Sequence, residues 1–158
     1  MIYKVGDTII HWTHGLGTVI AVEEMELAGT KKWYYVIEVD LLKLWVPIEE
    51  ASKGAIRFPM EPVQLKDLLE ILREPGRPLP DHYFQRKMAL RERMQKRTLE
   101  ELCHVIRDLK DRSAHHPLNA DDSSILFSAE EYLLDEWVIS IGTERSTAQR
   151  ELESMLVC

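Results

Sequence analysis

Histidines and cysteines are the side chains of this 158-residue chain that could act as bases, nucleophiles or metal ligands. His14 falls in a predicted turn, but no nucleophile or carboxylate lies at a recognisable catalytic spacing from it. His115 and His116 are adjacent in a predicted loop, and no second ligand cluster has the spacing of a zinc site. Cys103 lies on the apolar stripe of a predicted helix and Cys158 is the last residue, so we expect no disulfide. We therefore expect no catalytic residue, metal, cofactor or small-molecule substrate.

A second group of residues could contact nucleic acid. Residues 63–113 carry 12 basic and 9 acidic side chains, whereas the formal net charge of the whole chain is −7. In this basic segment Tyr83 could stack on an opened base step. The basic residues that follow and could neutralise phosphates are Arg86, Lys87, Arg91 and Arg93. The alternative is an ordinary solvated helix whose charges pair with their neighbours.

The sequence before residue 59 predicts strands. Some runs alternate in polarity and others are rich in aromatic and β-branched residues. These runs occupy residues 8–10, 18–24, 33–39 and 41–47, and residues 27–31 predict a turn. Four or five short strands can bury a core only by curling, so we expect a small β-barrel of the SH3/Tudor-like type over residues 1–60. Trp12 and Trp33 are expected to pack in a core or between domains.

The sequence after the prolines at 59 and 62 predicts helices. We expect an all-α five-helix bundle over residues 63–158, which makes the fold class α+β. The apolar stripes of its helices include Leu102, Ile106, Leu133 and Trp137.

Predicted helix starts are Asp81, Thr98 with Glu101 as a capping box, Asn119 with Asp122, and Thr143, and Gly142 is expected to end the fourth helix. Tyr83 and Phe84 begin the second helix, and one of them should be buried because neighbouring helix positions diverge by about 100°. No stretch approaches the length of a membrane span.

Residues 41–46 predict a strand suited to docking. Alternation sends Leu42, Leu44 and Val46 to one side of the strand and Leu41, Lys43 and Trp45 to the other. If the second side faces solvent, Trp45 becomes an exposed apolar anchor. The alternative is that Trp45 packs under a loop or on the helical domain.

Several short motifs, taken in order, resemble those of the CarD family of bacterial transcription regulators. The motifs are Val5-Gly6-Asp7, His14-Gly15-Leu16-Gly17, Tyr34-Tyr35-Val36-Ile37, Val46-Pro47, Gly54-Ala55-Ile56-Arg57, Val105-Ile106-Arg107-Asp108-Leu109 and Leu118-Asn119. The barrel is also similar to the polymerase-interacting module of the transcription-repair coupling factor. That protein continues into a helicase motor, and this chain has no Walker motif that would support one.

The resemblance implies two partners. The barrel would add its edge to the RNA polymerase β subunit through Leu41, Lys43, Trp45 and Pro47. The helical domain would contact the minor groove of promoter DNA at the upstream edge of the bubble and change open-complex stability. Tyr83 stands where the family has a wedge tryptophan, while Gln85 and Met88 replace residues that are usually basic.

These departures keep a second hypothesis open, in which the chain is an interaction module with little DNA binding. Arg107 and Asp108 are expected to form an internal ion pair rather than a DNA contact. The resemblance further implies a monomeric, cytoplasmic protein that reaches the nucleoid through RNA polymerase.

Overall fold

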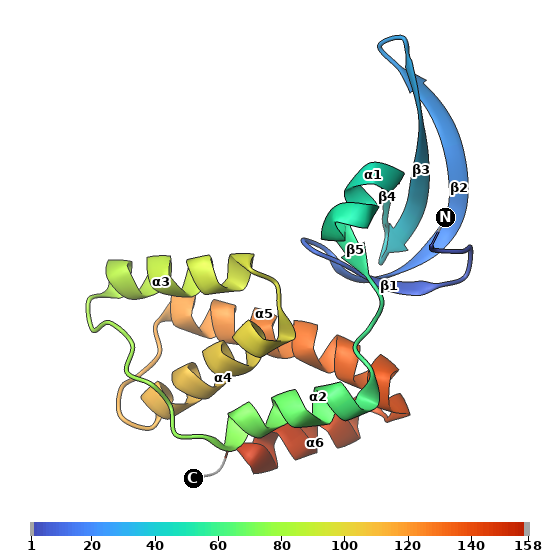
Figure 1. The fold of residues 1–158 in the computed structure, drawn as a ribbon. Coiled ribbons are helices and arrows are strands. Elements are labelled where there is room, and N and C mark those ends of the chain that lie inside the picture. Colours follow the sequence, from blue (N-terminus) through green and yellow to red (C-terminus); the bar gives the residue numbers. More distant parts are fainter. Residues whose placement is uncertain (1, 157–158) are drawn as a thin grey trace. The chain divides into compact units, whose positions relative to one another are not determined.

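The computed structural model describes residues 2–156, and the chain divides into two compact units, residues 1–59 and 60–158 (Figure 1). The first unit holds an antiparallel sheet and the second is helical, as an α+β chain requires. Among the described residues, no helix is both long and apolar enough to cross a membrane. Cys158, for which we expect no disulfide, lies outside the described residues.

The first unit is a five-stranded sheet in the order β4-β3-β2-β1-β5. Its strands are β1 (Thr8–His11), β2 (Gly15–Leu27), β3 (Thr30–Val39), β4 (Leu42–Pro47) and β5 (Ile56–Arg57). The predicted closed barrel is therefore wrong, because β4 and β5 are the two edges of an open sheet. Between them the chain forms helix α1 (Ile48–Glu50) and a π-helical turn, η1 (Ala51–Ala55), which places Ala51 in the core of the sheet unit.

The core of the sheet unit lies on one side of the strands. Tyr35, Ile37 and Val39 alternate along β3 and are at most 5 % exposed. The Tyr3 ring meets the Tyr35 ring edge to face at 5.4 Å, and its hydroxyl donates to the carbonyl of Ile56 at 3.1 Å. These contacts fix the chain before β1 against the same core that β3 covers.

Strands β2 and β3 form a long hairpin. Its two-residue turn is Ala28-Gly29, with φ of 52° and 80°, which is the positive-φ geometry that matches strand twist. Strand β4 pairs with β3 only as far as Tyr34. Residues 24–27 and 30–33 therefore form a two-stranded ribbon beyond the sheet, visible in Figure 1 as the projecting end of β2 and β3.

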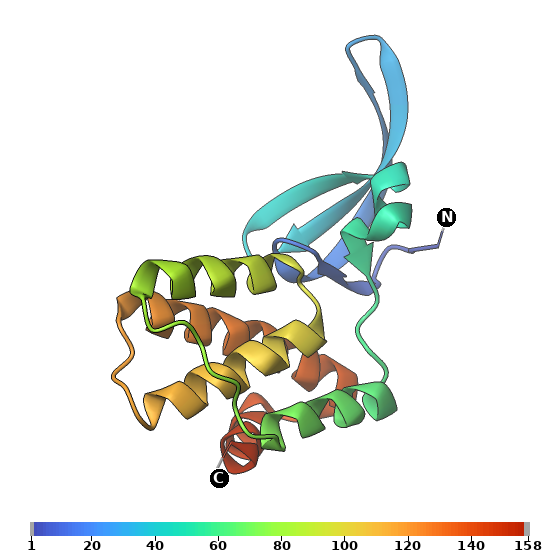
Figure 2. The same cartoon turned by 60° about the vertical axis from the view of Figure 1, so that its left-hand side comes forward.

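The second unit consists of helices of unequal length (Figure 2). They are α2 (Pro62–Leu69), the 3-10 turn η2 (Glu70–Arg73), α3 (Tyr83–Gln95), α4 (Leu99–Ser113), α5 (Ala120–Trp137), the π-helical turn η3 (Val138–Gly142) and α6 (Arg145–Met155). The described residues hold six α-helices, of which five lie in the helical unit, where the sequence predicts five. The extra helix, α1, is too short to produce a periodic signal and lies in the sheet unit.

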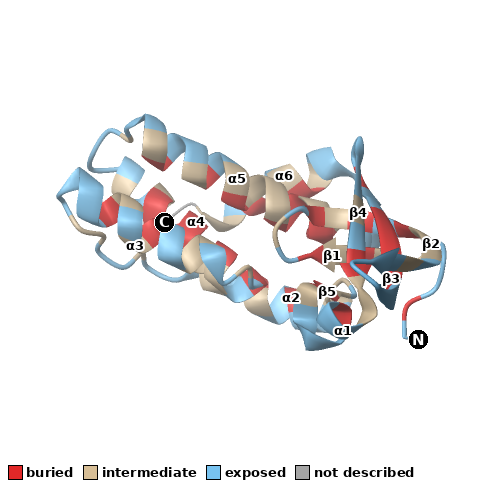
Figure 3. Ribbon diagram, turned by 90° about the horizontal axis from the view of Figure 1, so that it is seen from above, coloured by how far each residue is buried: buried red, intermediate tan, exposed pale blue. Residues whose placement is uncertain are grey.

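The helical core collects around α4. Leu102, Cys103 and Ile106 are at most 5 % exposed, and Trp137 at the end of α5 is fully buried, as its stripe predicts. Trp12 and Trp33 are not core residues, since they are 53 % and 47 % exposed. Figure 3 shows the buried residues in red along the helices.

Helix ends in this unit follow the capping predictions only in part. Asn119 and Asp122 form the full capping box of α5, and Thr98 accepts the amide of Glu101 at 3.2 Å. The Glu101 carboxylate accepts from Arg93 of α3. The N-cap positions of α3 and α6 are His82 and Glu144, one residue beyond the predicted Asp81 and Thr143.

Candidate docking edge and nucleic-acid interface

Strand β4 is an edge of the sheet and presents two different rows of side chains. It pairs with β3 on one side and with no other described strand. Val46 is 5 % exposed in the core and Leu44 packs against that core, whereas Lys43 and Trp45 are exposed. The predicted alternation is confirmed for these four residues, whereas Leu42, which was predicted on the core side, is 55 % exposed at the start of the strand. Leu41 belongs to the turn before β4 and is fully exposed.

Trp45 is exposed but held in place. It is opposite Val36 in the register with β3, so the two side chains share the outer face of the sheet. Val36 is only 3 % exposed although it points away from the core side of the sheet. Trp45 is 45 % exposed. The indole Nε1 of Trp45 donates to Glu23 at 3.4 Å across β3. The arrangement gives a positioned aromatic surface on the outer face, next to a free strand edge.

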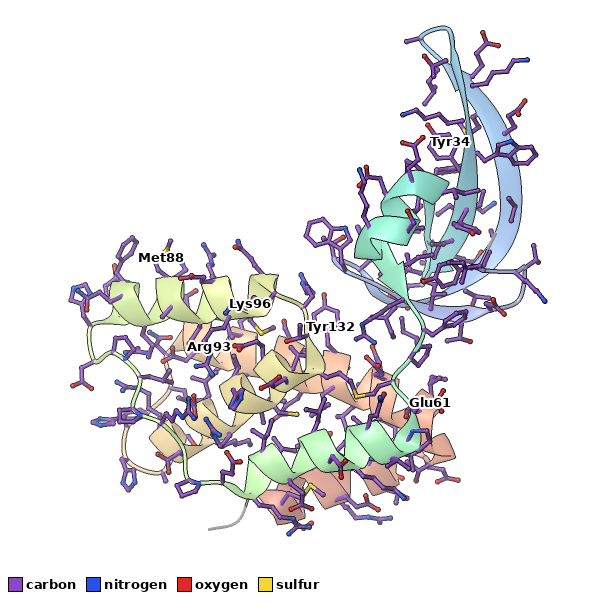
Figure 4. All side chains as sticks on the ribbon, in the orientation of Figure 1. Tyr34, Glu61, Met88, Arg93, Lys96 and Tyr132 are labelled. Carbon is purple, nitrogen blue, oxygen red and sulfur yellow. The ribbon has the colours of Figure 1, made fainter. Side chains whose placement is uncertain are left out.

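The first turn of α3 exposes both of its aromatic side chains. Tyr83 is 59 % exposed and Phe84 is 55 % exposed, so the expectation that one of them is buried is wrong. At this helix end the residues before α3 are themselves exposed, and the His82 ring stacks on the Tyr83 ring at 5.6 Å. Met88, one turn further on, is 49 % exposed and points outward in Figure 4.

Arg86 does not face solvent, which corrects its predicted contact with phosphate. Its side chain is 5 % exposed, and its Nε donates to the Asp122 carboxylate at 2.9 Å. One terminal nitrogen also donates to the carbonyls of Pro80 and Asp81, at 3.1 and 2.9 Å. Arg86 therefore joins α3 to α5 and to the segment that leads into α3. Desolvating a guanidinium is tolerable here because each of these partners accepts from it.

The other three basic residues differ in their exposure and in whether a carboxylate already pairs with them. Arg93 points to the inner side of α3 in Figure 4 and pairs with Glu101 and Asp108 of α4, at 3.3 and 3.1 Å. Lys87 is 27 % exposed and lies 3.4 Å from Asp121. Arg91 is exposed and has no carboxylate partner among the described residues. Of the four predicted cations, Arg91 is the one that is fully available to a ligand.

Sequence reasoning missed two members of the exposed α3 face. Phe84, Met88, Arg91 and Gln95 follow one another at helical spacings of four, three and four residues, opposite the buried Leu90. This spacing is visible in the sequence and could have identified Phe84 and Met88 as outward-facing. Arg97 was also missed, because nothing in the sequence indicates that its guanidinium lies 4.8 Å from the centre of the Tyr132 ring.

The Arg107-Asp108 pair is internal, as predicted. Both side chains are 2 % exposed and their Nε–Oδ1 distance is 2.9 Å. Arg107 also pairs with Glu74 at 2.9 Å, while Asp108 accepts the backbone amide of Arg77 at 2.9 Å. This motif therefore anchors the segment before α3 to α4.

The histidine and cysteine side chains that the structure describes form no recognisable reactive centre. The Nδ1 atom of His11 accepts the backbone amides of Thr13 and His14 at 3.1 and 3.2 Å, which orders the loop between β1 and β2. Burial raises the pKa of the Cys103 thiol to about 12, so the nucleophilic thiolate is suppressed. Within residues 2–156 no three metal-ligating side chains gather in one place.

Two family models match the two units. The CarD-like/TRCF RID domain matches residues 3–59, and the CarD C-terminal domain matches residues 67–153. A protein of Bacillus subtilis (strain 168) named "Putative transcription factor YdeB" is 29% identical over 144 residues, which is 89% of this chain and 93% of the relative. Together the matches cover both the sheet unit and the helical unit in order. The chain belongs to the CarD family, and its role is a transcription-related one in a family that interacts with RNA polymerase.

Proposed function

We propose that this protein regulates transcription by docking on the β subunit of RNA polymerase through β4 and contacting promoter DNA through α3. The observation that carries the docking half is the free edge of β4 with Trp45 positioned beside it. An unpaired strand edge offers backbone donors and acceptors to a partner strand, and pockets or anchors beside it supply specificity.

The docking surface consists of the exposed residues of β4 and its flanks. Trp45 supplies the apolar anchor and Lys43 a charge on the same row, with Leu41 and Pro47 at the two ends of the strand. Aromatic anchors that become fully desolvated commonly dominate an interface, and losing one often costs about 2 kcal/mol or more.

The variant Trp45→Glu tests this surface. It should weaken binding to purified RNA polymerase by about 30-fold or more, because it places a charge in the desolvated centre of the interface. Trp33→Glu is the matched control, since Trp33 is exposed to a similar extent, 47 % against 45 %, but lies on the ribbon away from β4. Circular dichroism checks that both variants fold. Equal polymerase affinity of wild type and Trp45→Glu would place the interface elsewhere.

The DNA half of the proposal rests on the exposed face of α3. Tyr83 and Phe84 are apolar groups suited to an opened base step, and Lys87 and Arg91 remain to neutralise phosphates. Two phosphate contacts correspond to a slope of roughly −2 in a plot of log affinity against log salt. Because the chain has a net charge of −7, DNA contact should depend on polymerase for its effective concentration.

Open-complex lifetime on one promoter, measured across a salt series, tests the DNA contact. Arg91→Ala should reduce the salt slope by about one unit, whereas Arg150→Ala, an exposed arginine on α6, should leave it unchanged. Tyr83→Ala should shorten the lifetime without changing the slope, because stacking releases no counterions. A Tyr83→Ala lifetime equal to wild type at every salt concentration would refute the wedge.

A polymerase-binding module with little DNA contact is the second candidate function. The internal pairing of Arg86 and Arg93 favours it, because two of the four predicted phosphate contacts are used within the helical unit. Under this function Trp45→Glu would abolish polymerase binding, while a forked promoter fragment would leave the affinity of the wild type for polymerase unchanged.

A further inference from the structure

A groove of about 380 Å³ lies between α3 and α5. The two helices run side by side in the same direction, since Arg86 meets Asp122 near their starts and Arg97 meets Tyr132 further along. One wall carries Arg91 and Gln95, and the other carries Ser124 and Ser128, which are one helical turn apart. A pocket of this volume is within the range that holds small ligands.

The arginines near the groove differ in whether they have a carboxylate partner. Arg86 and Arg93, the other arginines of α3, are bound to carboxylates of α5 and α4. Arg91 and Arg97 line the groove, and neither has a carboxylate partner within the described part of the chain. Lys87 is paired with Asp121 of α5, and no acidic side chain is among the described residues that line the groove. The groove is therefore a local excess of positive charge on a chain of net charge −7.

The backbone of Arg97 is in a conformation that residues other than glycine rarely adopt. Its φ is +53°, in the left-handed region, at a position after the end of α3 where glycine is the usual residue. Its guanidinium lies over the Tyr132 ring at 4.8 Å, which fixes the planar group at the end of the groove. In Figure 4 Tyr132 lies beside the end of α3.

Both serines add hydrogen-bond donors to this positive site. Among the described residues no group bonds to the hydroxyl of Ser124 or Ser128, so both hydroxyls can donate to a ligand. Two guanidinium groups with adjacent hydroxyl donors match the several oxygens of a phosphoryl group, which accepts all of these bonds.

We propose that the α3–α5 groove binds a phosphoryl group, carried either by a nucleotide-sized molecule or by a nucleic-acid backbone. Arg91 and Arg97 hold the charge, and Ser124 and Ser128 donate from the opposite wall. The groove shares Arg91 with the proposed DNA face, but the proposal does not rest on DNA binding, because free phosphate is sufficient to test it.

The test is a titration of the full chain with inorganic phosphate, in which NMR monitors the arginine Nε–Hε groups. Arg97→Gly removes the guanidinium and also relieves the left-handed backbone, so it should weaken phosphate binding about tenfold or more without lowering the melting temperature. Arg91→Gln should weaken binding to a similar extent. Arg150→Gln, which removes the same charge from the exposed surface of α6, should bind phosphate like the wild type.

Saturable shifts at Arg91 and Arg97 that are lost in the two groove variants support the site. No saturable shift in the wild type, or equal affinity in all four proteins, overturns it. Competition by a short DNA duplex would assign the phosphoryl group to a nucleic-acid backbone. Tighter binding of adenosine monophosphate than of phosphate, without competition by the duplex, would assign it to a small phosphorylated molecule. Failure of the DNA-lifetime experiment leaves these phosphate measurements unaffected.

Discussion

Replacing Arg86 should destabilise the helical unit rather than weaken DNA binding. Arg86→Ala leaves the buried Asp122 carboxylate without its guanidinium and removes the donor to two backbone carbonyls. Breaking a buried ion pair by removing one partner costs about 3–5 kcal/mol. For a domain of this size each kcal/mol lowers the melting temperature by about 4–8 °C, so a fall of at least about 12 °C is expected.

Lys87→Ala is the matched control, because Lys87 is the next residue of α3 and pairs with Asp121, the acid that precedes Asp122 in α5. Its pair with Asp121 is 3.4 Å long and half exposed on the acidic side, and such surface pairs contribute about 0–1 kcal/mol. Thermal melting, monitored through the helical circular dichroism signal, should give clearly different melting temperatures for the two variants. The double variant Arg86→Met with Asp122→Asn should recover part of the loss, because no unpaired charge remains buried. Arg86→Ala with wild-type stability and a reduced salt slope for DNA would refute this reasoning.

Three other predictions concern separate parts of the chain. Gly17→Ala should destabilise the sheet unit by about 1–3 kcal/mol in urea denaturation, because a Cβ there would lie 2.7 Å from Val39 Cγ2 and 2.9 Å from the Glu38 carbonyl. Cys103 should stay unlabelled by iodoacetamide at pH 8 in the native protein and react in urea, as peptide mass mapping would show, because its pKa is about 12. Glu130→Gln should stabilise the helical unit at pH 7 but not at pH 4. Desolvation raises the pKa of Glu130, so the folded state binds that proton more tightly, and wild-type stability falls as pH rises above the unfolded pKa.

Local patterns predicted the elements well where one short segment determines the outcome. The alternation of β4, the capping box of Asn119 and Asp122, and the burial of Trp137 each depend on residues close in sequence. The Arg107-Asp108 pair was also expected, because both charges lie within one short motif of the helical unit.

Long-range partners explain the errors. Arg86 is interpreted as a surface cation in the sequence, and its contact with Asp122, 36 residues away, helps to make its burial favourable. Glu101 leaves the capping box at Thr98 incomplete because the guanidinium of Arg93 from another helix binds its carboxylate. The open sheet was missed because the segment between β4 and β5 forms helical turns that are too short for any periodic signal.

The two-stranded ribbon at the end of β2 and β3 has a consequence for solubility. Both of its edges are unpaired over residues 24–27 and 30–33, and such edges can recruit strands from other copies and begin aggregation. Its facing pairs include Glu26 with Lys31 and Met25 with Lys32, so charges occupy the ribbon where an incoming strand would have to approach. Strand recruitment is therefore discouraged at the ribbon, which leaves β4 as the edge that suits the proposed docking.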